Sequence, residues 1–122
     1  MSSECGDFNA NAPYQQIDPA RCKPKTRAAW EAQGGRLPRR VVQRLLDAGY
    51  VDTFHAVDRT AGETQGTFST EFPGQRVDYV FTHGVDVTWI RDAGVVTRSA
   101  AREASDHFPV FAEIDKRPAN PA

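Results

Sequence analysis

The sequence has few cysteines, no long apolar run and almost no excess of charge. Its two cysteines, Cys5 and Cys22, have no metal-ligand spacing and are too few for a disulfide framework, so we expect free thiols. No apolar stretch approaches the roughly 18 residues that a membrane span needs. Fifteen Lys and Arg against sixteen Asp and Glu leave a formal charge of -1, so the total demands no polyanionic partner. The sequence leaves localisation unknown, between cytoplasmic and secreted.

The charge is less even locally. Between residues 21 and 44 there are eight basic residues and one acid, Glu31. A run of this kind favours a solvated helix face, and a phosphate-attracting rim is the second interpretation. A nucleic-acid-binding module built on this run ranks lowest among the possible functions, because the net charge is slightly negative.

The length of 122 residues predicts one domain. We expect a short helix over residues 26–32, ended by a Gly-Gly pair, and a clear amphipathic helix over 37–48. In the second helix the spacing places Leu37, Val41, Leu45 and Ala48 on one apolar face, which Val42 and Leu46 widen. Pro38 lies in the first turn.

The rest of the chain predicts strands and loops. We expect a strand or extended connection over residues 50–57 and a long loop over 58–74. Three strands are expected over 76–82, 85–90 and 108–114, the first two joined as a hairpin. Residues 116–122, rich in Pro and Ala, are expected to form a loosely ordered tail.

Asp78 lies within an apolar strand pattern and therefore needs a partner, because an unpaired buried carboxylate is costly. The stretch "ASDHFPVF" offers one. Pro109 delays the start of the regular strand, so Asp106 and His107 lie in a loop and can approach the same site. A buried Asp beside His107 would fix its tautomer, which suits an imidazole that donates to a phosphoryl oxygen.

A third polar segment, "GDFNA", stands near the start of the sequence. Gly6 permits a tight or positive-φ backbone, Asp7 offers a hard oxygen ligand or a water-orienting base, and Asn9 offers an amide donor. Phe8 is expected to point into the core. Taken alone, such a stretch is most often a turn.

In this order, "GDFNA", "RVDYVF" and "SDHFPV" resemble the C-terminal half of the endonuclease/exonuclease/phosphatase superfamily, which has the deoxyribonuclease I-like fold. The resemblance runs from residue 6 to about 114. It implies an α/β (α+β) fold, the C-terminal half of a four-layer α/β/β/α sandwich, with one mainly antiparallel sheet and covering helices. It also implies an enzyme that hydrolyses phosphoesters with Mg²⁺ or Mn²⁺, as a phosphodiesterase, nuclease or phosphatase.

The resemblance also implies roles for individual residues. Asp7 and Asn9 would position the attacking water and bind the phosphoryl group, and Asp7 and Asp106 would hold the metal. His107 would stabilise the charge that develops on phosphorus, and Asp78 would orient His107. The substrate would be a nucleic acid, a phospholipid or a small phosphate ester.

The family's N-terminal half, with its metal-binding Glu, has no counterpart in this sequence. We therefore expect residues 1–115 to form a partial domain with an exposed apolar sheet face, leading to self-association or dependence on a second chain. Two interpretations stay open: a phosphoesterase that needs the missing half, or a non-catalytic remnant with weak phosphate or metal binding.

Overall fold

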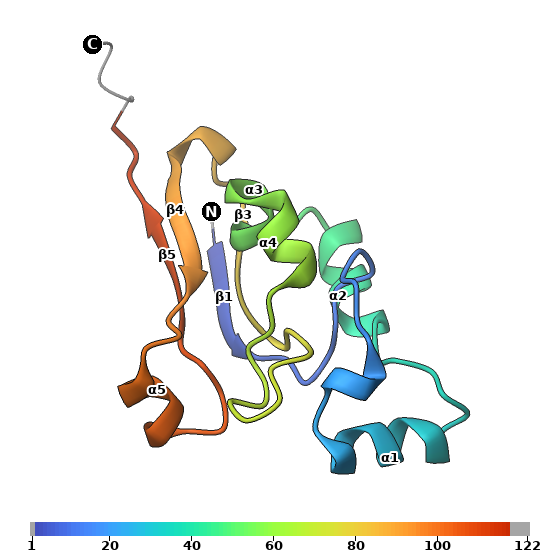
Figure 1. Cartoon of the computed structure of the whole chain (residues 1–122). Coiled ribbons are helices and arrows are strands. Elements are labelled where there is room, and N and C mark those ends of the chain that lie inside the picture. Colours follow the sequence, from blue (N-terminus) through green and yellow to red (C-terminus); the bar gives the residue numbers. More distant parts are fainter. Residues whose placement is uncertain (1, 118–122) are drawn as a thin grey trace.

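The computed structural model describes residues 2–117 as an α+β arrangement with antiparallel strands (Figure 1). This confirms the expected fold class. The elements in chain order are β1 (Ser2–Asp7), η1 (Pro19–Arg21), α1 (Pro24–Ala32), α2 (Arg40–Asp47), β2 (Val51–Asp52), α3 (Thr53–Val57), α4 (Arg59–Thr64), β3 (Asp78–His83), η2 (Val87–Trp89), β4 (Ile90–Val95), α5 (Ser99–Ala104) and β5 (Val110–Ile114).

Strand β3 is the centre of a three-stranded sheet with the order β1-β3-β2. Both neighbours are antiparallel to it, and the register places Asp7 opposite Asp78 and Ser2 opposite His83. Strand β1 is exposed along its whole length, as its polar residues require. The sheet therefore brings the start of the sequence beside the strand that carries Asp78.

Strands β4 and β5 form a separate antiparallel pair, and β5 also contacts β3. The hairpin expected between residues 76–82 and 85–90 is wrong, because β3 pairs with β1 and β2 only among the described residues. Residues 87–89 form a 3₁₀ turn, and Asp86 accepts a hydrogen bond of 2.9 Å from the backbone N–H of Thr88. This local bond competes with strand pairing and delays the strand to Ile90.

Two further segments differ from expectation. Only Val51 and Asp52 of the expected strand at 50–57 are extended, and the next five residues form α3. The expected loop at 58–74 contains α4, whose first turn is capped by Asp58 through a 3.1 Å bond from the N–H of Ala61. An Asp in this position favours helix initiation, a signal that the loop interpretation overlooked.

The two expected helices are present as α1 and α2, but burial on α2 centres on Val42, at the wider edge of the predicted apolar face, and not on Val41. Val42 is completely buried, whereas Val41 is 49% exposed. The helix begins at Arg40, and Val42 packs into the core cluster with Tyr79 and Phe81. Since neighbouring helix residues point about 100° apart, packing against the sheet decided between two adjacent valines.

The core lies between α2 and the sheet. Phe8 packs on this cluster from the edge, with its ring centroid 5.1 Å from that of Phe81, as expected from the sequence. Such edge-to-face pairs are favourable beyond their buried area. The contact anchors the residue that separates Asp7 from Asn9.

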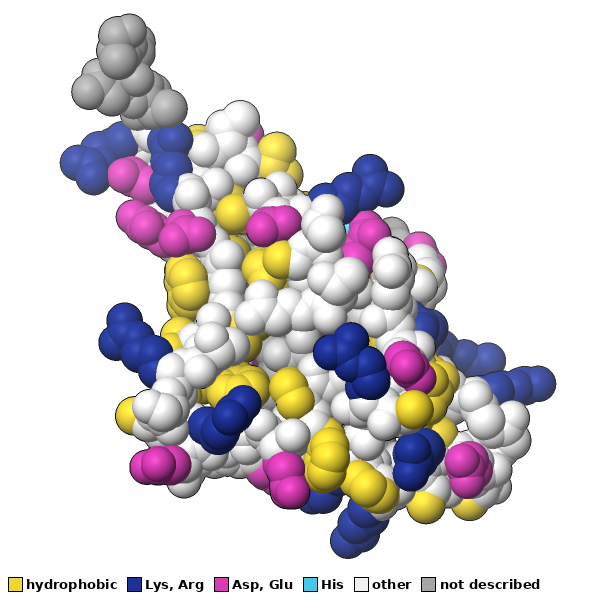
Figure 2. All heavy atoms as spheres, in the orientation of Figure 1, with side chains coloured by type: hydrophobic (Ala, Val, Ile, Leu, Met, Phe, Trp, Pro, Cys, Tyr) yellow, Lys and Arg dark blue, Asp and Glu magenta, His cyan; other side chains and the backbone are white. Residues whose placement is uncertain are grey.

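Some large apolar side chains lie on the surface. Phe111 and Ile114 of β5 are each 40% exposed, and Val57 and Val87 are also exposed. Figure 2 shows apolar side chains in small groups among charged and polar ones. Self-association through such a surface stays a prediction.

Of the expected tail, residues 118–122 lie outside the described part of the chain. Within residues 2–117, the helices are too short or too polar to cross a membrane.

Candidate active site

Three segments far apart in the sequence meet at one place. Asp7 is the last residue of β1, Asp78 is the first of β3, and His107 lies in the loop that enters β5. The β1–β3 register sets the two acids opposite each other, and a bridge between Phe68 and His107 attaches the third segment. The proximity therefore comes from backbone pairing.

The His107 ring is held by Asp78. Its Nδ1 lies 2.8 Å from Oδ2 of Asp78, a hydrogen bond to a carboxylate that is 8% exposed as a residue. Because the carboxylate accepts, Nδ1 carries the proton, and Nε2 is the nitrogen that faces outward. The side chain of His107 is 28% exposed, so a substrate can reach it.

Two solvated carboxylates flank Nε2. Oδ2 of Asp7 lies 3.8 Å away and Oδ1 of Asp106 lies 3.9 Å away, with 47% and 64% of the two side chains exposed. These separations are too long for hydrogen bonds. They leave space between imidazole and acids for a water, an ion or a phosphoryl oxygen.

The same surroundings shift the pKa of His107. Partial burial lowers it, but the hydrogen bond that Nδ1 donates to Asp78 and the charges of Asp78, Asp7 and Asp106 outweigh burial, so the pKa lies above the ordinary value. The protonated imidazole therefore persists to higher pH than in a free histidine. A ring in that state donates from Nε2, which is the role required beside a developing negative charge.

Asp7 is itself oriented by a tight turn. Its Oδ1 accepts a 2.7 Å hydrogen bond from the backbone N–H of Asn9, whose φ is 49°. Asn is one of the few residues that adopt this left-handed conformation readily. Gly6 has a φ of 127°, which any side chain would strain. The "GDFNA" letters thus specify the turn that points the Asp7 carboxylate at the site.

The ligand atoms of Asp7, Asp78 and His107 all lie within 4.8 Å of one another, close enough to hold a metal ion. Asp106, expected as a metal ligand, is not a member of this compact group. Since Asp78 is engaged by Nδ1 of His107, the open oxygens are those of Asp7 and Asp106. Exposed carboxylates of this kind fit a hard cation such as Mg²⁺, which keeps several waters and is usually bound through one or two carboxylates.

Two residues of the site were missed at the sequence level. The ring of Phe68 lies 4.7 Å from that of His107, and Oγ1 of Thr67 accepts hydrogen bonds from the N–H groups of Val77 and Asp78 at 3.0 and 3.2 Å. Both come from the segment 58–74, expected as a long loop of a length that is more often functional than idle. An aromatic residue in a polar, Gly-rich stretch was the available signal.

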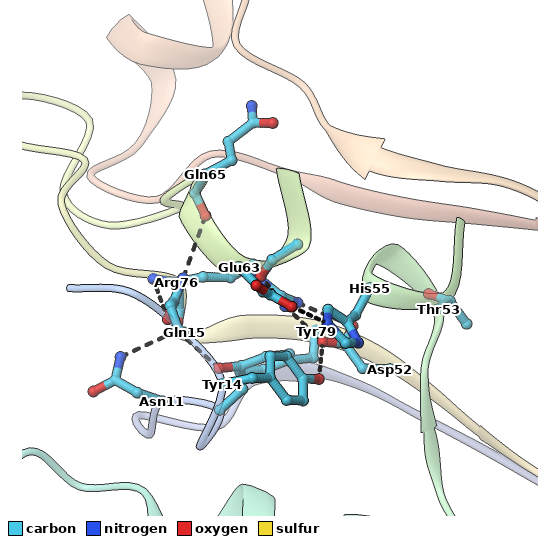
Figure 3. A network of polar contacts seen from close by, with 12 residues as sticks. Asn11, Tyr14, Gln15, Asp52, Thr53, His55, Glu63, Gln65, Arg76 and Tyr79 are labelled. Carbon is cyan, nitrogen blue, oxygen red and sulfur yellow. Dashed lines mark hydrogen bonds and ion pairs between the residues drawn. The ribbon is translucent and has the colours of Figure 1, made fainter. Parts of the chain in front are cut away.

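Arg76, two residues before Asp78 in the sequence, lies in a buried polar network (Figure 3). The guanidinium of Arg76 donates to both oxygens of Asp52, at 3.0 and 2.6 Å, and to the carbonyl of Gly62 at 2.6 Å. The hydroxyl of Tyr14 donates to Oδ2 of Asp52 at 2.6 Å. Burial, together with the charge of Asp52, raises the pKa of Tyr14 far above its usual range. The hydroxyl therefore stays protonated as a donor.

The network also holds the segment after Asn9. The side-chain amide of Asn11 donates to the carbonyl of Arg76 at 3.2 Å, and Gln15 accepts from the N–H of Arg76 at 3.1 Å. His55 belongs to the edge of the network, stacked 3.8 Å from Tyr14. These contacts connect the segment that follows Asp7 to the start of β3, so they help to fix the positions of Asp7 and Asp78 relative to each other.

No protein-family model and no curated protein match this chain. Its fold is similar to that of a solved 3′-5′ exonuclease (NExo) from Neisseria meningitidis, with a TM-score of 0.60 and 25% identity. The similarity covers 93% of this chain and 44% of the exonuclease. The chain therefore spans less than half the length of that protein and shares the fold of part of a nuclease.

Proposed function

We propose that this chain is part of a metal-dependent phosphoesterase of the endonuclease/exonuclease/phosphatase superfamily, and that its substrate is a nucleic acid. The observation that carries the proposal is the His107 ring, bonded to Asp78 through Nδ1 and facing Asp7 and Asp106 through Nε2. The similarity to a nuclease supports the substrate class.

In the proposed reaction the scissile phosphate lies beside Nε2 of His107. Asp7 orients the attacking water, and the amide of Asn9 donates to a phosphoryl oxygen. His107, protonated at both nitrogens, donates a proton or a hydrogen bond from Nε2 to the charge that develops on the phosphoryl group, while Asp78 accepts from Nδ1 and stabilises the protonated ring. A bound Mg²⁺ or Mn²⁺, held by Asp7 and Asp106, would supply Lewis-acid stabilisation of the same charge.

We propose further that residues 1–115 are a partial domain. Two carboxylates provide few ligands for Mg²⁺, which takes six oxygens and accepts water for the rest. An additional acidic ligand from outside this sequence, or from a second chain, would complete the metal site. The alternative is a remnant that retains the Asp78–His107 pair but performs no turnover.

Hydrolysis of a labelled single-stranded oligonucleotide and of bis(p-nitrophenyl) phosphate, with Mg²⁺, Mn²⁺ or EDTA, tests the proposal. We expect metal-dependent turnover that His107→Ala lowers by at least about a hundredfold. His83→Ala is the matched control, because His83 is exposed and packs on Tyr50 away from the acids. Equal turnover in the His107→Ala variant would refute the catalytic role.

Absence of turnover in every condition would favour the remnant. Calorimetric titration with Mn²⁺ then separates the two cases further. Binding that Asp7→Asn weakens and Asp47→Asn does not would show that the acids still form a metal site. Asp47 serves as the control because it lies on the exposed side of α2.

A further inference from the structure

An open pocket of about 400 Å³ lies beside the candidate active site. Its lining residues come mainly from η1–α1 and the two loops that flank the site: Asn9, Lys23, Lys25, Thr26, Ala29, Trp30, Gln33, Pro38 and Phe68. Asn9 and Phe68 belong to both places, since Asn9 donates to Asp7 and Phe68 packs on His107. A ligand attached to a phosphate at His107 can therefore extend directly into this pocket.

The lining combines two cationic residues with several apolar ones. Lys23 and Lys25 are its charged residues, and none of the lining residues is acidic. The first turn of α1, which supplies Lys25 and Thr26, also carries no acid. A phosphate group would meet two ammonium groups here without a competing carboxylate.

Most of the other lining residues are apolar. Phe68 is partly exposed, Trp30 is 7% exposed, and Ala29 and Pro38 are the other apolar residues of the lining. The ammonium group of Lys23 already lies 5.5 Å from the centre of the Phe68 ring. The amides of Asn9 and Gln33 add donors and acceptors. Aromatic surface beside lysines is the combination that single-stranded nucleic-acid sites use to bind bases and phosphates.

We infer that this pocket binds one nucleotide unit of the substrate, with the base against the side chains of Phe68 and Trp30 and a phosphate at Lys23 and Lys25. The inference rests on the proposed function and narrows its substrate class. A volume of about 400 Å³ lies in the range of small-ligand sites and suits a single nucleotide unit. Glycerol 3-phosphate or inorganic phosphate would pair with the two lysines but would make no stacking contact with Phe68 or Trp30.

Part of the basic run at residues 21–44 lines this pocket. Two of its eight basic residues line the pocket, and the run contains Trp30, which faces the same space. The phosphate-attracting interpretation therefore applies at Lys23 and Lys25. The lysine outside the run, Lys116, lies far along the sequence and is exposed, which makes it a matched control.

The fluorescence of Trp30 provides a readout that does not require turnover. In a Trp89→Phe background Trp30 is the single tryptophan. We expect saturable quenching when dAMP is added in EDTA. Lys23→Gln/Lys25→Gln should weaken dAMP binding at least about tenfold, as the loss of charge-assisted contacts predicts, and Lys116→Gln should not change it.

A second variant guards against misfolding. Ala29→Phe fills the pocket without removing charge, and it should abolish quenching while circular dichroism stays native. Inorganic phosphate and glycerol 3-phosphate should bind at least about tenfold more weakly than dAMP, because they lack the ring that stacks. Equal binding of glycerol 3-phosphate and dAMP, or equal losses from the Lys116→Gln variant, would overturn the inference.

His107→Ala separates this inference from the proposed function. The variant should still quench with dAMP, since His107 does not line the pocket. In the unaltered chain, dAMP binding without turnover would leave the pocket assignment standing and contradict the enzyme. Turnover of oligonucleotides with no dAMP quenching would contradict the pocket assignment and leave the enzyme standing.

Discussion

Two ion pairs of this protein have opposite surroundings, although Arg76 of the first and Asp78 of the second are only two residues apart in the sequence. Arg76 and Asp52 are enclosed, with their side chains 1% and 2% exposed, and every oxygen of the carboxylate has a partner. The pair of Asp78 and His107 is closed on the acid side and open on the imidazole side, at 11% and 28%. The first pair has no free group, whereas the second presents Nε2 to solvent.

This difference separates a structural pair from one whose imidazole is open to solvent. Taking both charges out of water is costly, and the bidentate geometry of Arg76 and Asp52 recovers that cost only while both partners are present. His107 keeps access to water, so its remaining nitrogen can exchange a proton with solvent. The pair of Arg76 and Asp52 anchors the start of β3. Asp78, the first residue of β3, is thereby placed to bond the ring of His107.

The largest expected effect comes from breaking the enclosed pair. Arg76→Ala leaves the carboxylate of Asp52 buried with Tyr14 as its remaining side-chain donor, and we expect the free energy of unfolding to fall by about 3–5 kcal/mol. Urea denaturation followed by circular dichroism measures this. Arg76→Lys keeps the charge but loses the fork, so its loss should be intermediate.

Arg59→Ala is the matched control for that experiment. Arg59 forms an exposed ion pair with Glu63, with 83% of its side chain accessible. Solvent screens such pairs, so its removal should change the unfolding midpoint much less than Arg76→Ala. Similar losses of unfolding free energy for the two arginine variants would show that the enclosed Arg76–Asp52 pair is no more important for stability than the exposed Arg59–Glu63 pair.

The next effect concerns the open pair. Asp78→Asn removes the acceptor charge at Nδ1, so the pKa of His107 should fall toward or below its ordinary value, as measured by NMR titration of the imidazole protons. Asp47→Asn on α2 should leave it unchanged. An unaltered His107 pKa in the Asp78→Asn variant would show that the pair is not electrostatically coupled.

The same shift predicts how stability depends on pH without added metal. The pKa of His107 is raised in the folded state, so its contribution is complete below the unfolded value of about 6.5 and is lost as pH rises through the folded pKa. The free energy of unfolding should therefore decline across that window. In the Asp78→Asn variant this part of the decline should disappear, while the Asp47→Asn control should retain it.

The smallest effect extends the comparison to the two thiols. Cys5 is exposed on β1, whereas Cys22 is 2% exposed, and burial, with the charge of Asp18, raises its pKa. A chromogenic disulfide reagent should titrate one thiol in the native protein and both in urea. Rapid reaction of two thiols without denaturant would show that the interior around Cys22 opens readily.

Much of the site could be predicted from the sequence. The family resemblance carried by "GDFNA", "RVDYVF" and "SDHFPV" in this order pointed to Asp7, Asp78 and His107, and the structure brings these together. The need to pair a carboxylate in an apolar strand was sufficient to expect a partner for Asp78. The roles in catalysis stay predictions.

Other features could not be predicted from local patterns. The partner of Arg76 is Asp52, a residue 24 positions away that belongs to a two-residue strand. Nothing in the letters around either residue indicates the other, because the contact depends on how β2 pairs with β3. The expected hairpin between residues 76–82 and 85–90 fails for the same reason, because β1 and β2 occupy both edges of β3.

By itself the sequence determined which chemical groups are present and which turns present them. Gly6 and Asn9 specify a left-handed turn, Pro109 delays a strand, and Asp58 and Asp86 cap short helices, because these effects depend on a residue and its immediate neighbours. Only the tertiary structure decided that Asp7 faces Asp78, that Val42 rather than Val41 is buried, and that two lysines share a pocket with Trp30. Such outcomes depend on packing and strand register between distant segments, and many distant pairings satisfy the same local pattern.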